Sequence, residues 1–219
     1  MIERSCYFAG MDLPTPATGK GASTRSMLLG RACELAGKVG LEGVTIGELA
    51  TAAGMSKSGV FAHFGSREDL VRQTLDWAAT SFGEQVMGAA LKQARGLPRL
   101  QAIADAWIDW ILAHPEGCVF LGAAIEYDGR PGPMRDHVAG LLRRWQQMLD
   151  RAIALAVEQG HLRADVAPAL LSFELHGLMY GLHHQRLHQP DAAPQLARQA
   201  VRALFDRYRA GDAGTSPVR

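Results

Sequence analysis

The chain has 219 residues, of which 47% are hydrophobic and 21% are charged, and its formal net charge is +1. This composition is typical of a globular protein and excludes the disordered, collagen-like and membrane-embedded classes. Because the net charge is close to zero, any contact with nucleic acid must come from a local basic surface rather than from an overall positive field.

The two ends of the chain lack the periodicity of a regular element. Residues 1–22 mix Pro and Gly with Ser and Thr, and residues 211–219 have the same character. We predict a disordered N-terminal arm over residues 1–22 and a disordered tail over residues 211–219.

Between these ends the apolar residues recur with a helical period, and no segment alternates apolar and polar residues as a half-buried strand does. The predicted fold is therefore all-α. A first helix is expected from about Thr24 to Gly40. Thr45, with Glu48 three residues later, predicts a capping box at the start of a short second helix that ends at Gly54.

Further caps and breaks define the remaining helices. Ser56 is expected to cap a third short helix that runs through His63, and Ser66 a fourth with acidic residues in its first turn. The segments with helical periodicity, each broken by Gly or Pro, are residues 66–95, 98–114, 133–159, 168–188 and 192–209, with one short helix at 120–127 inside an irregular stretch.

The segment over residues 45–64, TIGELATAAGMSKSGVFAHF, has the steric pattern of a helix-turn-helix. Ala50 is small enough for two helices to approach closely, and Gly54 can take the left-handed conformation that the turn needs. Met55 and Val60 are expected in the core. Five residues are not needed to fill the core and would face the major groove and its phosphates: Lys57, Ser58, Gly59, Phe61 and His63.

This segment resembles the DNA-binding part of the TetR family of repressors. The resemblance is carried, in the family's order and without gaps, by Thr45, Ile46, Leu49, Ala50, Ala53, Gly54, Met55, Ser56, Val60, Phe61, His63, Phe64, Ser66, Arg67, Glu68 and Leu70. Two departures are that Phe61 stands where most members have tyrosine and that Ser58-Gly59 reverses the usual order. The missing phenolic hydroxyl leaves Phe61 only apolar contacts, for example to a thymine methyl group.

The resemblance implies a helix-turn-helix DNA-binding domain over residues 23–70 and a ligand-binding and dimerisation domain over residues 71–210. It also implies that Thr45, His63 and Arg67 contact phosphates. Lys57 can donate to a guanine edge or to a phosphate, and Arg25 to a phosphate or the minor groove. The predicted DNA-binding residues are Arg25, Thr45, Ser56, Lys57, Ser58, Gly59, Phe61, His63 and Arg67.

A second group of residues, in the C-terminal part, is typical of an apolar pocket with a few polar groups. The predicted ligand-binding residues are Trp107, Trp110, Phe120, Glu126, Tyr127, His176, Met179 and Tyr180, with Glu126, Tyr127 and His176 as the polar determinants. The alternative is that each of these side chains only fills the core. The histidines between His176 and His188 lack a carboxylate or cysteine at a convincing offset, so no metal and no cofactor are predicted.

These observations together predict a transcriptional regulator. We expect a homodimer, formed through residues 168–188 and 192–209, that binds a double-stranded, palindromic DNA operator and responds to a small-molecule effector. The family's usual behaviour is repression relieved by the ligand. An enzyme is the first alternative, but the chain has no catalytic motif such as a nucleophile elbow, a phosphate loop or HExxH. A scaffold that dimerises without binding DNA is the second.

The cysteines Cys6, Cys33 and Cys118 form no CxxC pair and follow no secretory leader. A thiol sensor at Cys118 would want a basic neighbour or a nearby resolving cysteine, so a structural role is favoured. No apolar stretch approaches the ~20 residues that span a bilayer. We therefore expect a cytoplasmic protein with no membrane partner.

Overall fold

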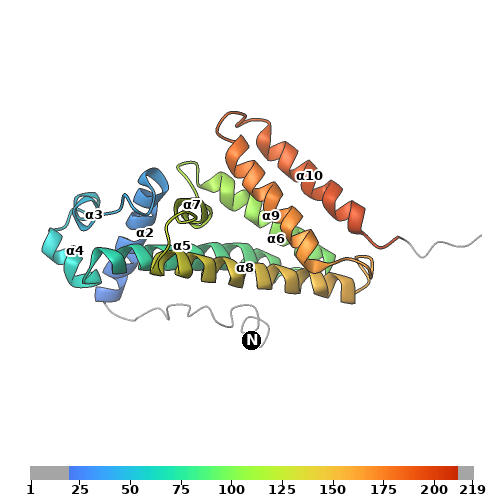
Figure 1. Cartoon of the computed structure of the whole chain (residues 1–219), viewed down its shortest axis with the longest axis horizontal. Coiled ribbons are helices and arrows are strands. Elements are labelled where there is room, and N and C mark those ends of the chain that lie inside the picture. Colours follow the sequence, from blue (N-terminus) through green and yellow to red (C-terminus); the bar gives the residue numbers. More distant parts are fainter. Residues whose placement is uncertain (1–19, 212–219) are drawn as a thin grey trace, which may run out of the picture. The chain divides into compact units, whose positions relative to one another are not determined.

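The computed structural model describes residues 20–211, and the structural statements below concern this part of the chain. It contains nine α-helices and, besides them, one isolated β-bridge between Leu162 and Arg209 (Figure 1). The prediction of an all-α fold is confirmed. Most of the predicted arm and tail, residues 1–19 and 212–219, lie outside the described residues.

The helices follow the predicted order with small differences at their ends. Their bounds are α2 (Lys20–Val39), α3 (Ile46–Ala53), α4 (Lys57–Phe64), α5 (Arg67–Ala90), α6 (Leu97–Ala113), α7 (Val119–Glu126), α8 (Pro133–Glu158), α9 (Pro168–Gln185) and α10 (Ala193–Tyr208). Helix α2 starts at Lys20 rather than near Thr24, so residues 20–22 of the predicted arm are helical. Helices α5 and α9 end before the predicted Arg95 and His188. The prediction extended both helices too far because the apolar periodicity continues into the turns that follow them.

The chain forms two compact units. The first contains residues 20–84 and 113–144 of the described part, and the second contains residues 85–112 and 145–211. Helices α5 and α8 each contribute to both units. The predicted domain over residues 23–70 falls inside the first unit together with α7, and the division at residue 70 stays a prediction.

The core of the first unit is built from α2, α3, α4 and the start of α5. Leu28, Leu49, Val60 and Leu70 are each 0% exposed, one from each of these helices. Burial of such apolar side chains is the main free-energy term that holds the short helices α3 and α4 in place, because eight-residue helices are marginal alone.

The second unit has an aromatic centre and a pair of packed helices. The Trp107 ring meets the Trp145 ring edge-on with centroids 4.9 Å apart. Helices α9 and α10 lie side by side (Figure 1). Ion pairs fasten α10 to α6, since the Arg198 guanidinium lies 3.2 Å from Asp105 Oδ1 and 2.6 Å from Asp109 Oδ1. In the described part of the chain, no helix has both the length and the apolar character needed to cross a membrane.

Candidate nucleic-acid interface

Helix α3 is started by the predicted cap. Thr45 has an extended backbone, and its Oγ1 accepts a hydrogen bond from the Glu48 backbone N–H at 3.1 Å. The same hydroxyl donates to Glu48 Oε2 at 2.9 Å. Thr45 is thus confirmed as the cap, and the Glu48 carboxylate accepts from the hydroxyl of Thr45. This arrangement satisfies a backbone donor that the first helical turn leaves free.

The turn between α3 and α4 depends on Gly54. Its φ of 63° and ψ of 31° are left-handed, a conformation that costs little only for glycine. The backbone N–H of Met55 then donates to the Ala50 carbonyl at 2.9 Å, which closes the turn over α3. Ser56 follows as the predicted cap of α4, its Oγ accepting from the Gly59 N–H at 3.1 Å. The helix-turn-helix geometry is therefore confirmed.

Helix α4 buries one face and presents the other to solvent. Val60 and Phe64 are buried, at 0% and 5% exposure. Lys57, Ser58 and Phe61 are exposed, with 54% of the Phe61 surface accessible. Three of the five residues that were predicted to face the groove and its phosphates are therefore exposed on the second helix of the motif. Gly59 and His63 are half-buried at the edges of this surface.

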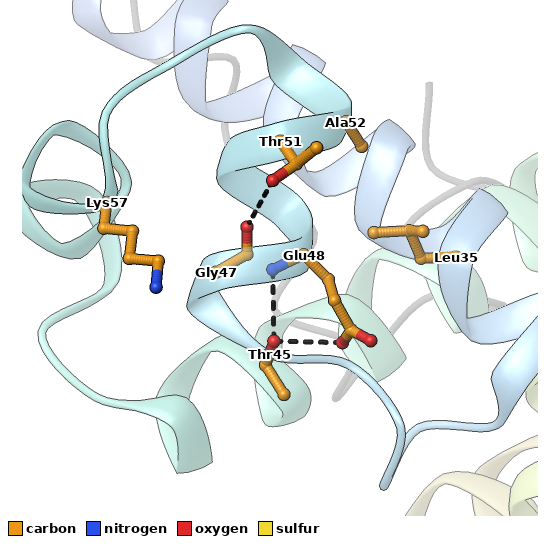
Figure 2. Close-up of a pocket in the computed structure, with 7 residues that line it drawn as sticks. All are labelled: Leu35, Thr45, Gly47, Glu48, Thr51, Ala52 and Lys57. Carbon is orange, nitrogen blue, oxygen red and sulfur yellow. Dashed lines mark hydrogen bonds between the residues drawn. The ribbon is translucent and has the colours of Figure 1, made fainter.

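An open pocket lies in front of α3, beside this surface. Figure 2 shows it, with a volume of about 630 Å³, and its lining residues are Leu35, Thr45, Gly47, Glu48, Thr51, Ala52 and Lys57. The Lys57 side chain extends from α4 toward the first turn of α3. A Cβ atom built on Gly47 would lie 3.2 Å from Lys57 Cε and 3.5 Å from its Nζ. The lining combines the Lys57 ammonium, a donor suited to DNA backbone oxygens, with the Glu48 carboxylate and two threonine hydroxyls that already donate to Glu48 Oε2 and to the Gly47 carbonyl.

Arg25, predicted to contact DNA, is engaged inside the first unit. Its guanidinium donates to Gln73 Oε1, through Nε at 3.2 Å and also through Nη2, and stacks over the Phe64 ring at 5.6 Å from the centroid. These contacts connect α2 to α4 and α5. Its role toward DNA stays a prediction.

Arg67 is likewise held by the connection between α2 and α3. Its Nε donates to the Val44 carbonyl at 3.2 Å, and its Nη2 to the Glu42 carbonyl at 2.5 Å and to Glu42 Oε2 at 3.0 Å. A guanidinium so engaged has fewer donors left for a phosphate. Its contact with a phosphate stays a prediction.

Two of the predicted polar ligand determinants, Glu126 and Tyr127, contact the same connection. The Glu126 carboxylate accepts the backbone N–H groups of Leu41 and Glu42, each at 2.8 Å. The Tyr127 hydroxyl donates to Glu42 Oε1 at 2.5 Å. Gly40, with a φ of 77°, lets Glu126 approach, since a Cβ there would lie 2.9 Å from Glu126 Oε1.

These contacts shift the acidities of both partners. The hydrogen bond from Tyr127 and the nearby Arg67 guanidinium hold the pKa of Glu42 below its usual range, against a smaller opposing effect of burial. Burial and the Glu42 carboxylate raise the pKa of Tyr127 far above its usual value. The pair is therefore a phenol donating to an ionised carboxylate at neutral pH.

The remaining predicted ligand-binding residues are mostly buried. Phe120, in the first unit, packs on Phe82 with centroids 5.2 Å apart. Those in the second unit are Trp107, Trp110 and Met179, which are buried, and His176 and Tyr180, which are half-buried. For all of them ligand contact stays a prediction.

His176 belongs to a polar cluster inside the second unit. Its ring lies edge-on to Trp107 with centroids 5.0 Å apart, and its Nδ1–H donates to the Ser172 carbonyl at 2.8 Å. Ser172 Oγ contacts Gln146 Nε2 at 2.5 Å. Burial lowers the pKa of His176, so the imidazole is neutral at pH 7. Within residues 20–211, no three His, Cys, Asp or Glu side chains gather as a metal site requires.

Two residues near α3, Glu42 and Gly47, were not predicted from the sequence to belong to the site. Glu42 lies in a connection where neither periodicity nor a cap marks it, so no local signal could have found it. Gly47 carries a weak signal, because a glycine inside the first turn of an eight-residue helix is unfavourable for helix formation.

Comparison with known proteins is consistent with this geometry. Residues 28–74 match the family described as bacterial regulatory proteins, tetR family, and residues 96–201 match the tetracyclin repressor-like C-terminal domain. The chain is 31% identical over 141 residues to the HTH-type transcriptional regulator NfxB of Pseudomonas aeruginosa, covering 63% of this chain and 70% of that protein.

Two solved structures share the fold. A TetR transcriptional regulator from Chloroflexus aurantiacus superposes with a TM-score of 0.77 at 23% identity, over 88% of this chain and 99% of that one. AibR, solved with isovaleryl coenzyme A and operator DNA, superposes with a TM-score of 0.67 at 24% identity, over 83% of this chain and 98% of that one.

Proposed function

Because the chain belongs to the TetR family of bacterial transcriptional regulators, we propose that it is a ligand-responsive repressor that binds a palindromic operator as a homodimer. Members of the family are DNA-binding transcription factors, so the chain is a regulator of transcription and not an enzyme.

The exposed surface of α4 is the observation that carries the proposal for operator binding. Lys57, Ser58 and Phe61 are exposed there, and the helix contains no carboxylate. A duplex groove is lined by anionic phosphates, so a short helix with a cation and a hydroxyl at its start and no acidic residue suits it. Phe61 supports apolar readout, because a phenyl ring can meet a thymine methyl group.

Dimerisation is supported by exposed apolar side chains on α9, on α10 and in the turn between them. Phe173 is 73% exposed and Leu187 76%, and Leu170 and Leu196 are exposed as well. Leu170 and Phe173 lie one helical turn apart on α9, so they share a face. Exposed apolar side chains of this kind are typical of protein interfaces, and membership of the TetR family favours a second copy of the chain as the partner that covers them.

A two-fold dimer implies a two-fold operator. Two copies of α4 related by a dyad axis would read the same sequence on opposite strands. The half-site centres are then expected about 34 Å apart, or a multiple of this, since only this spacing puts successive major grooves on one side of the duplex.

Response to an effector is supported by the contacts of α7. Glu126 and Tyr127, at its C-terminal end, hold the connection that precedes α3. A ligand that binds better to an arrangement with a displaced α7 or α5 would therefore favour a different position of α3 and α4. The size of this population shift is set by the difference between the ligand's affinities for the two arrangements. AibR, which shares the fold, was solved with both an acyl coenzyme A and operator DNA.

The proposal is tested by selecting duplexes from a random-sequence library with the purified full-length chain. We expect enrichment of an inverted repeat, and binding that weakens steeply as salt rises. Lys57→Ala should reduce the affinity, while Lys92→Ala, which removes the same charge from an exposed position in the second unit, should not. Retention of identical duplexes by the wild type and Lys57→Ala, with equal affinity, would refute the assignment of α4.

A further inference from the structure

The carboxylate of Glu42 is shared between two side chains that come from different elements. Its Oε1 accepts the hydrogen bond of the Tyr127 hydroxyl at 2.5 Å, and its Oε2 accepts that of Arg67 Nη2 at 3.0 Å. Tyr127 directly follows α7, and Arg67 is the first residue of α5. All three residues belong to the first compact unit. Glu42 therefore joins the end of α7 to the start of α5, the helix that follows the helix-turn-helix.

The Arg67 guanidinium is held by the backbone as well as by this carboxylate. Its Nε donates to the Val44 carbonyl at 3.2 Å, and its Nη2 also donates to the Glu42 carbonyl at 2.5 Å. Within the part of the chain that the structure describes, Nη1 makes no hydrogen bond. The Arg67 side chain is 39% exposed, so the two N–H groups of Nη1 are donors that a DNA phosphate can reach.

The pairing of Glu42 with Arg67 is incomplete while Tyr127 is in place. A guanidinium and a carboxylate prefer to pair through two parallel hydrogen bonds, but here the Tyr127 hydroxyl occupies one of the two carboxylate oxygens. The carboxylate is ionised at neutral pH, since the Tyr127 hydrogen bond and the Arg67 guanidinium hold the pKa of Glu42 below its usual range. If Tyr127 withdraws, the negative Oε1 loses its donor and attracts the remaining terminal nitrogen of Arg67, Nη1.

We propose that Tyr127 and Arg67 compete for Oε1 of Glu42, and that this competition controls DNA binding. While the Tyr127 hydroxyl is in place, Nη1 of Arg67 is available to a phosphate. When α7 is displaced, Glu42 binds both terminal nitrogens of Arg67 and withholds them from DNA. This inference rests on the proposed function, to which it adds the residue that passes a displacement of α7 on to the start of α5.

The substitution Tyr127→Phe removes the hydroxyl and keeps the ring, so it reproduces the loss of the donor at Oε1 alone. The Glu126 carboxylate still accepts the backbone N–H groups of Leu41 and Glu42, each at 2.8 Å, and so still holds the connection before α3. This variant therefore separates the change of partner at Oε1 from a release of the whole connection.

The test is a double-mutant cycle on the full-length chain with Tyr127→Phe, Glu42→Gln and their combination. The matched control is Tyr208→Phe, which removes another tyrosine-to-glutamate hydrogen bond, of 2.8 Å to Glu174 Oε2, in the second unit. Dissociation constants for a duplex selected by the wild type from a random library are measured by fluorescence anisotropy over a series of salt concentrations. Sedimentation velocity and circular dichroism check the oligomeric state and the helical content of each variant.

We expect Tyr127→Phe to weaken DNA binding by about tenfold or more, as the loss of a charge-assisted hydrogen bond to a phosphate would. The slope of log K against log salt should fall by about one for each copy of the chain on the duplex. In the Glu42→Gln background the same substitution should change the affinity less than about twofold, because a neutral amide does not draw in the Arg67 guanidinium. Tyr208→Phe should leave the affinity unchanged.

A second measurement follows the Arg67 guanidinium without DNA. In protein labelled with ¹⁵N-arginine, its resonances are assigned by comparison with Arg67→Lys. Guanidinium protons that are held by a carboxylate through two hydrogen bonds exchange more slowly with solvent than those of a terminal nitrogen without a partner. We expect the Nη1 protons to exchange more slowly in Tyr127→Phe than in the wild type, and this slowing to be absent from the double variant.

The remaining outcomes separate the inference from its premise. Equal weakening of DNA binding by Tyr127→Phe in both backgrounds would show that Tyr127 acts by packing, and the inference would be wrong. It would also be wrong if Tyr127→Phe left either the DNA affinity or the solvent exchange of the Arg67 protons unchanged. Absence of salt-dependent DNA binding by the wild type would refute the proposed function, and the proton exchange would then still decide whether Oε1 of Glu42 changes its partner.

Discussion

The Tyr127 hydroxyl donates a hydrogen bond of 2.5 Å to Oε1 of Glu42, a residue 85 positions earlier in the chain. Tyr127 is the residue directly after α7, and Glu42 lies in the connection between α2 and α3. Because α3 begins a few residues later, this bond and those of Glu126 fix the start of the helix-turn-helix from outside it.

Removal of the hydroxyl should weaken this attachment. We expect Tyr127→Phe to lower the free energy of unfolding by about 1 to 2 kcal/mol at pH 7.5, because a hydrogen bond to an ionised carboxylate is lost. The pKa of Glu42 is lowered in the folded state, so its stabilising contribution is present above its usual pKa and is lost as the pH falls through the folded value. The effect of Tyr127→Phe should therefore shrink in acid.

Urea unfolding at pH 7.5 and pH 4 checks this expectation. The matched control is the same substitution in a Glu42→Gln background, where the ionised acceptor is absent. An equal loss of stability at both pH values and in both backgrounds would mean that Tyr127 acts by packing alone.

Gly40 should tolerate a side chain less well than Gly54. Both have positive φ values, 77° and 63°, so alanine at either costs about 1 to 2 kcal/mol in backbone strain. A Cβ at Gly40 would also lie 2.9 Å from Glu126 Oε1, whereas nothing lies within 4 Å of one at Gly54. We expect Gly40→Ala to be the more destabilising by about 1 to 3 kcal/mol, because the Glu126 hydrogen bonds are displaced. Equal losses in urea unfolding would contradict the importance of this approach.

The apolar surface of α9 should decide the oligomeric state. We expect Phe173→Glu to be monomeric in sedimentation velocity at concentrations where the wild type is dimeric, since a buried unpaired charge is costly at an interface. Ile125→Glu is the matched control, because Ile125 is 62% exposed on α7 in the other unit. If both variants sediment like the wild type, the dimer forms elsewhere.

The half-buried His176 of the second unit should make the free energy of unfolding depend on pH near neutrality. Burial lowers the pKa of His176 below its usual value of 6.5, so the folded state binds fewer protons than the unfolded state. Its contribution is complete above pH 6.5 and is lost as the pH falls below it, by up to about 1.4 kcal/mol per pH unit. His176→Gln should flatten the decline between pH 6.5 and pH 5 in urea unfolding, and His188→Gln, at an exposed position, should not. A decline as steep as in the wild type would show that another group causes it.

The amino-acid sequence by itself determined the elements that depend on neighbours along the chain. Thr45 and Ser56 as caps and Gly54 as the turn residue were predicted and are confirmed, because each acts on backbone groups within about four residues. The helical period of the apolar residues likewise predicted the order of the helices. The exposed face of α4 followed in large part from the same local pattern, since Lys57, Ser58 and Phe61 were predicted to lie outside the core and are exposed.

Tertiary structure alone decided which side chains meet across the chain. Glu126 and Tyr127 have the polar character of ligand determinants, yet their hydrogen bonds go to a connection some 85 residues away. The two arginines predicted to contact phosphates are engaged in the same way by distant partners, Arg67 by Glu42 and Arg25 by Gln73. The physical reason is that helix caps and periodicity act over a few residues, whereas the partner of a long polar side chain is set by how helices pack, which no local pattern encodes.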